Sequence, residues 1–108
     1  MDKLEELLKR IDKFNKDRDW DQFHSEENLA KSIAIEAGEL LECYQWNTNS
    51  NNIEHVKEEL ADVMNYCLQM CLVLNIDPIN IINNKIDINE KKYPITLSKG
   101  VSTKYNEL

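Results

Sequence analysis

The chain has 108 residues, a net charge of −7, 42% hydrophobic residues, two glycines and two prolines. This composition is typical of a compact helical protein, excludes fibrous and disordered classes, and predicts one domain over residues 1–108. The acidic charge argues against a nucleic-acid polymer as partner, and the lack of a signal-like start or of a bilayer-spanning apolar run predicts a cytoplasmic protein without membrane contact.

The first expected helix covers residues 2–18, where Leu4, Leu7, Leu8, Ile11 and Phe14 recur at spacings of three and four. The next segment, residues 17–24, breaks this period and contains Trp20, Phe23 and His24. Two roles stay open for Trp20, which either covers the small core or stacks on a ligand. His24 alone is typical of a surface histidine.

The second expected helix runs from the N-cap Ser25 to about Trp46 and carries two acids. Glu36 and Glu39 lie one turn apart, along the edge of an apolar stripe. The stripe consists of Leu29, Ile33, Ala37, Leu40, Leu41 and Tyr44. Residues 47–52 form a polar break rich in asparagine, which favours turns and joins this helix to an antiparallel successor.

The third expected helix, residues 53–74, repeats the acidic spacing with Glu59 and Asp62. These acids border a stripe of Val56, Leu60, Val63, Cys67, Cys71 and Leu74, and we expect Cys43, Cys67 and Cys71 to be buried thiols. After Tyr66 the helix is apolar almost all round, and such a surface needs cover on every side. We therefore expect a homo-oligomer with this helix in the interface.

The fourth expected helix starts after Asp77, with Pro78 at its first position, and ends before Pro94. Its inward residues are expected to be Ile79, Ile81, Ile82 and Ile86. Lys85 and Asn89 share a face at i, i+4. Residues 95–108 have no helical period and are expected to form an irregular tail.

Packing the second and third helices together would bring Glu36, Glu39, Glu59 and Asp62 into one small space. Crowded carboxylates raise each other's pKa values and favour a bound cation. Oxygen ligands suit a hard ion such as Mg²⁺. Ordinary solvated acids remain the alternative. A carboxylate-bridged di-iron site is disfavoured, because neither His24 nor His55 follows a glutamate by three residues.

These motifs together resemble the all-α nucleoside triphosphate pyrophosphohydrolases of the MazG type, and within them the dCTP pyrophosphatase branch. The family pattern is Glu-x-x-Glu on one helix and Glu-x-x-Asp on the next, here Glu36, Glu39, Glu59 and Asp62. The resemblance extends to residues 18–24, Gln45-Trp46, Tyr66, residues 85–89 and Tyr93-Pro94.

The resemblance implies an all-α, four-helix MazG-like bundle that forms dimers or tetramers. It implies Mg²⁺-dependent hydrolysis of a nucleoside triphosphate, such as dCTP or a related pyrimidine nucleotide, to the monophosphate and pyrophosphate. The four acids would be catalytic and hold the metal. Substrate would be bound by Trp20, His24, Trp46, Tyr66, Lys85 and Asn89. A preference for dUTP or purine nucleotides, and a non-catalytic interaction module, are the alternatives.

The two tryptophans flank the acid-bearing second helix, so about 30 Å of helix separates them within one subunit. They cannot hold one base between them in a monomer. We therefore expect a shared site, in which Trp46 lines the metal pocket of its own subunit and Trp20 comes from the partner.

Overall fold

The computed structural model describes residues 2–49 and 52–108, and its chain divides into two compact units that meet between Asn75 and Ile76 in the sequence. Every regular element in the described residues is helical, as the sequence predicts. None of these helices has both the length and the apolar character needed to span a membrane.

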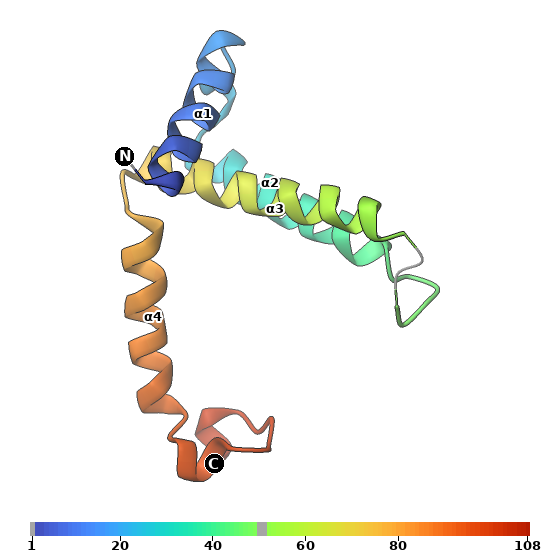
Figure 1. Ribbon diagram of the computed structural model, residues 1–108, viewed down its shortest axis with the longest axis vertical. Coiled ribbons are helices and arrows are strands. Elements are labelled where there is room, and N and C mark those ends of the chain that lie inside the picture. Colours follow the sequence, from blue (N-terminus) through green and yellow to red (C-terminus); the bar gives the residue numbers. More distant parts are fainter. Residues whose placement is uncertain (1, 50–51) are drawn as a thin grey trace. The chain divides into compact units, whose positions relative to one another are not determined.

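The first unit contains α1 (Lys3–Asp17), the short 3-10 helix η1 (Asp21–Phe23), α2 (Glu26–Glu42) and α3 (Ile53–Leu74). In Figure 1, α2 lies along α3, and α1 crosses the part of α3 that follows Ala61. The acid-bearing helices are therefore direct neighbours. The polar break between them was predicted for residues 47–52, of which 50 and 51 lie outside the described residues.

Helix starts follow the predicted capping chemistry. The Ser25 hydroxyl accepts a hydrogen bond from the Asn28 amide at 3.1 Å, and the Asp77 carboxylate accepts one from the Ile79 amide at 2.9 Å. The predicted N-caps of α2 and α4 are thus confirmed. Asn52 caps α3 in the same way, by accepting from the His55 amide at 3.2 Å.

The end of α2 differs from the prediction, because the helix stops at Glu42 and not near Trp46. The amides of Cys43, Tyr44 and Gln45 each bond to the carbonyl three residues earlier, so the chain tightens into successive turns. Tyr44 and Trp46 are exposed beyond that point. No buried apolar face continues the helix there, which removes the packing that would extend it.

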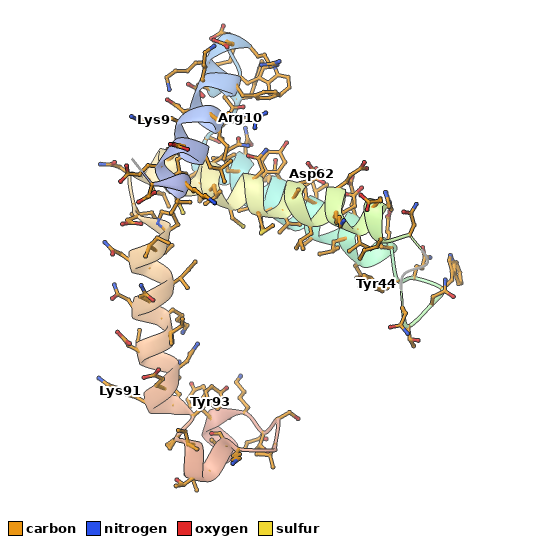
Figure 2. All side chains as sticks on the ribbon, in the orientation of Figure 1. Lys9, Arg10, Tyr44, Asp62, Lys91 and Tyr93 are labelled. Carbon is orange, nitrogen blue, oxygen red and sulfur yellow. The ribbon has the colours of Figure 1, made fainter. Side chains whose placement is uncertain are left out.

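The second unit contains α4 (Pro78–Lys92), the four-residue α5 (Ile95–Ser98) and the 3-10 helix η2 (Tyr105–Glu107). The prediction of an irregular tail over residues 95–108 is therefore wrong in part. The Tyr93 and Tyr105 rings meet edge to face at 6.1 Å, and the Lys92 ammonium lies 4.6 Å from the Tyr105 ring centroid. These ring contacts hold the last residues against the end of α4, where Figure 2 labels Tyr93.

The core of the single chain is small. Leu29 is fully buried, and Val56 and Cys71 are nearly so. The predicted burial of all three thiols is wrong, because Cys67 is exposed and Cys43 is half-buried. The predicted inward isoleucines of α4 are also exposed within the chain, namely Ile79, Ile81, Ile82 and Ile86. One chain of this size offers too little apolar surface to cover both faces of its helices.

Candidate functional site

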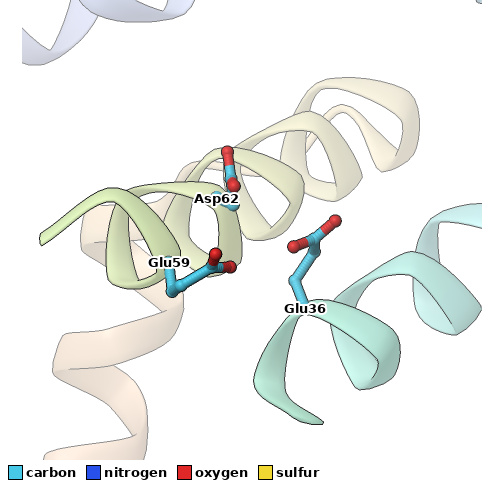
Figure 3. Close-up of side chains that lie close together, drawn as sticks. All are labelled: Glu36, Glu59 and Asp62. Atoms are coloured by element: carbon cyan, nitrogen blue, oxygen red, sulfur yellow. The ribbon is translucent and has the colours of Figure 1, made fainter. Parts of the chain in front are cut away.

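Three carboxylates from two helices converge at one place in the first unit. Glu36 comes from α2, whereas Glu59 and Asp62 come from α3. One oxygen of each lies within 4.8 Å of one oxygen of the others, and Figure 3 shows the three side chains pointing toward one another. The Oε2 atoms of Glu36 and Glu59 are buried, with no hydrogen-bond partner in the described residues. The side-by-side packing of α2 and α3 produces this cluster, as the paired acid spacings predict.

Glu39, the fourth acid of the motif, is exposed and lies outside the group of three. Glu39 nevertheless raises the pKa values of two cluster acids, Glu36 and Glu59. Hydrogen bonding with Glu39 is the largest cause that raises the pKa of Glu36 from 4.5 to about 7, followed by burial and by the negative charges of Glu39, Asp62 and Glu59. Glu39 therefore borders the cluster.

The neighbouring groups respond to the same crowding. Burial raises the pKa of Glu59, and hydrogen bonding and charge from Glu39 add to this rise. His55, whose Nε2 lies 3.8 Å from a Glu59 oxygen, lowers the pKa of Glu59 by its charge and so partly offsets this rise. Burial, with the charges of Glu36, Asp62 and Glu39, raises the pKa of Tyr66. The Tyr66 hydroxyl consequently remains a hydrogen-bond donor at neutral pH.

A divalent cation fits this arrangement. All available ligand atoms in the cluster are carboxylate oxygens, which suit hard ions. Two of the oxygens are buried and have no partner within the described part of the chain, and a cation would relieve both this deficit and the repulsion between like charges. The cluster is thus a possible acidic metal site.

A cavity of about 220 Å³ adjoins the cluster, and we call it the acid cavity. Two cluster acids, Glu36 and Asp62, line it, together with three of the residues predicted to bind substrate: Trp20, His24 and Tyr66. Its other lining residues are Phe14, Asn15, Asn65 and Gln69. The structure therefore brings together residues from the first helix, the aromatic loop and both acidic helices.

A larger cavity of about 450 Å³ lies between α1 and α3. It shares five lining residues with the acid cavity, namely Phe14, Asn15, Asp62, Asn65 and Gln69. It is lined mainly by apolar side chains, including Leu7, Ile11 and Leu68, with Arg10 also in its wall. Figure 2 labels Arg10 on α1 and Asp62 on α3.

Trp46 is placed differently from the prediction. It is 84% exposed and lines a separate surface hollow with Tyr44, Gln45, Asn47 and Thr48. Trp20, in contrast, lines the acid cavity of its own chain and meets Phe14 edge to face at 5.6 Å. The sequence predicts Trp46 in the subunit's own pocket and Trp20 from a partner. Within one chain the structure instead places Trp20 at the acid cavity and Trp46 away from it.

Lys85 and Asn89 belong to the second unit, where they lie one turn apart on the exposed surface of α4. Their predicted role in binding phosphates stays a prediction.

Sequence reasoning missed two buried amides of the acid cavity. Asn15 is 4% exposed and Gln69 is 6% exposed. Gln69 offers a signal in retrospect, because it is the only amide between Tyr66 and Leu74, whereas Asn15 stands among charged residues and offers none. A polar side chain in an otherwise apolar run is informative about a site.

Comparison with known proteins gives consistent results. The MazG-like family model matches residues 31–108. dCTP pyrophosphatase 1 of Homo sapiens is 33% identical, over 97% of this chain and 67% of its own length, and that of Rattus norvegicus is 32% identical over the same shares. A crystal structure of a pyrophosphatase from Archaeoglobus fulgidus superposes with a TM-score of 0.82 at 40% identity, over 87% of this chain and 94% of that one. The predicted fold class is therefore confirmed, and the chain belongs to the MazG-like family.

Proposed function

We propose that this chain is a nucleoside triphosphate pyrophosphohydrolase, which hydrolyses dCTP or a related pyrimidine deoxynucleotide to the monophosphate and pyrophosphate with Mg²⁺. The observation that carries the proposal is the convergence of Glu36, Glu59 and Asp62 beside a cavity that also contains Trp20. The names of the relatives, dCTP pyrophosphatase 1 and a pyrophosphatase, support the same reaction class.

Glu36, Glu59 and Asp62 would hold Mg²⁺ as ionised carboxylates, and Glu39 at the border of the cluster would add a further negative charge that favours the cation. When bound, the ion would neutralise charge on the triphosphate and make a water molecule acidic enough to attack phosphorus. Mg²⁺ suits this task because it is commonly held by few carboxylates together with substrate phosphates.

The aromatic side chains of the acid cavity would position the nucleotide. The Trp20 ring offers a face on which a base can stack, and Phe14 supports that ring from its edge. The protonated Tyr66 hydroxyl would donate a hydrogen bond to the phosphate chain, as its raised pKa permits. Lys85 and Asn89 of α4 would supply a positive charge and a neutral donor for the phosphates.

The reaction transfers the nucleotidyl group, which contains the α-phosphorus, to water. The water oxygen bonds to the α-phosphorus, the bond from that phosphorus to the bridging oxygen breaks, and pyrophosphate leaves. In ¹⁸O-labelled water the label should therefore appear in the monophosphate. Release of the diphosphate with orthophosphate would contradict the proposal.

Two adjacent glutamates provide a matched test of the metal site. Glu59 belongs to the cluster, whereas Glu58 is exposed outside it. We expect Glu59→Gln to lower Mg²⁺-dependent pyrophosphate release from dCTP on the order of 100-fold or more, because it removes a charged ligand. Glu58→Gln makes the same chemical change and should retain activity. Equal activities of the two variants would remove the support for this cluster as the catalytic centre.

A further inference from the structure

Gln69 is a buried polar side chain that the reaction described above does not use. It is 6% exposed, and its Oε1 atom has no hydrogen-bond partner in the described residues. A buried acceptor without a donor destabilises the fold, because it has lost its hydrogen bonds to water without replacement. Gln69 lines the acid cavity and two further hollows, so a turn of its flexible carboxamide would bring this oxygen to a ligand donor in the acid cavity.

The position of Gln69 relative to the acids suits one end of a nucleotide. Gln69 follows Asp62 by seven residues, which is about two helical turns and about 10 Å along α3. Both residues line the acid cavity. A nucleotide with its phosphates at Asp62 would therefore direct its base toward Gln69. Trp20 lines the same cavity and offers a face for stacking.

The second buried amide lies in the same wall. Asn15 of α1 is 4% exposed and also lines the acid cavity. An apolar cavity would bind any base by stacking and burial alone, with little discrimination. Amides in the wall instead allow hydrogen bonding to the edge of the base.

We infer that Gln69 is a specificity-determining residue, whose carboxamide oxygen accepts a hydrogen bond from the 4-amino group of cytosine in the acid cavity. This inference rests on the proposed function. Cytosine presents that amino group as a donor on its edge, whereas uracil and thymine present a carbonyl oxygen at the same position. Their carbonyl would leave Gln69 Oε1 without a donor and would face it with a second acceptor.

The test compares dCTP with the 2-pyrimidinone deoxyribonucleoside triphosphate, which lacks only the 4-amino group. Pyrophosphate release is measured with Mg²⁺ for the wild-type protein and for Gln69→Leu. We expect wild type to prefer dCTP in kcat/KM by tenfold or more, on the order expected for an unpaired buried group. In Gln69→Leu this ratio should fall to about one, because kcat/KM for dCTP declines while that for the analogue does not.

Leucine is close to glutamine in size and removes the unpartnered oxygen, so the variant should melt no lower than wild type. If Gln69→Leu does not fold, Gln69→Met replaces it with an unbranched side chain. Gln22→Leu is the matched control, because Gln22 is exposed and bonds only to Asp19 in the described residues. It should leave the substrate ratio unchanged.

The outcomes distinguish a failure of the role of Gln69 from a failure of the proposed pyrophosphohydrolase function. Wild type that cleaves dCTP without preferring it over the analogue, or Gln69→Leu that keeps the full ratio, would overturn the role of Gln69 alone. Wild type that releases no pyrophosphate from either nucleotide would overturn the proposed function and this inference with it.

Discussion

The carboxyl group of Glu36 has a pKa raised to about 7, first by hydrogen bonding with Glu39 and then by burial. The folded protein therefore binds this proton more tightly than the unfolded chain, in which the pKa is near the ordinary 4.5. The resulting contribution to stability is fully present below about pH 4.5 and is lost as the pH rises through about 7. Glu59, whose pKa is also raised, acts in the same direction.

Without divalent ions, the melting temperature should consequently fall as the pH rises from about 5 to 8. In Glu36→Gln this decline should be smaller, since the amide cannot ionise. Thermal unfolding in EDTA across this pH range measures both curves. Glu42→Gln, a change at an exposed acid of the same helix, is the control and should follow wild type. Parallel curves for wild type and Glu36→Gln would exclude Glu36 as the titrating group.

At the residue scale, the sequence predicts the acids of the site better than its cavity. The sequence predicts that Glu36, Glu39, Glu59 and Asp62 come together, and the structure groups three of them, because regular helices transmit spacing into position. Glu39 lies outside this group, and the catalytic role of the acids stays a prediction. The burial of Gln69 is not predictable in this way. It depends on where α1 crosses α3, and that crossing is a long-range contact.

At the element scale, helix starts are predictable because capping is local. Ser25 and Asp77 accept hydrogen bonds from amides two or three residues ahead. Helix ends are less predictable, because they depend on packing. Helix α2 stops at Glu42, four residues before Trp46, and Trp46 itself is exposed. The ordered tail depends on the contact between Tyr93 and Tyr105, two rings twelve residues apart that no local pattern relates.

The C-terminus of α3 offers a test of local backbone conformation. Asn75 ends the helix in the left-handed region, with φ 54° and ψ 49°. Asparagine tolerates this region, glycine favours it and alanine does not. Asn75→Ala should lower the free energy of unfolding by about 1 kcal/mol, whereas Asn75→Gly should leave it nearly unchanged. Urea denaturation measures both. Equal losses in the two variants would show that the backbone angle is not the cause.

At the scale of the whole molecule, we predict that the chain forms a homo-oligomer. Ile79, Ile82 and Ile86 share one face of α4, and Ile82 is 56% exposed within the single chain. Contiguous apolar surface of this kind is typical of interfaces. Ile82→Asp should lower the mass measured by size-exclusion chromatography with light scattering. Asn80→Asp adds the same charge to another face of α4 and should not. A monomeric wild type would contradict the prediction.

The final prediction concerns Trp46, which lies beyond the end of the acid-bearing helix and is 84% exposed in its own chain. In a homo-oligomer, we expect this ring to close the acid cavity of a partner, whose own Trp20 already lines it. Trp46→Ala should then raise KM by the loss of stacking, which contributes on the order of 1–3 kcal/mol per base. Mixing Trp46→Ala with the inactive Glu59→Gln protein should restore part of the activity, because some cavities then combine intact acids with an intact Trp46. Mixing Trp20→Ala with Glu59→Gln should restore none, since Trp20 and the acids of a cavity come from the same chain. Recovery with Trp20→Ala alone would mean that the tryptophans are distributed between subunits in the opposite way. Equal recovery in both mixtures would mean that both rings come from the partner, which would also contradict the prediction.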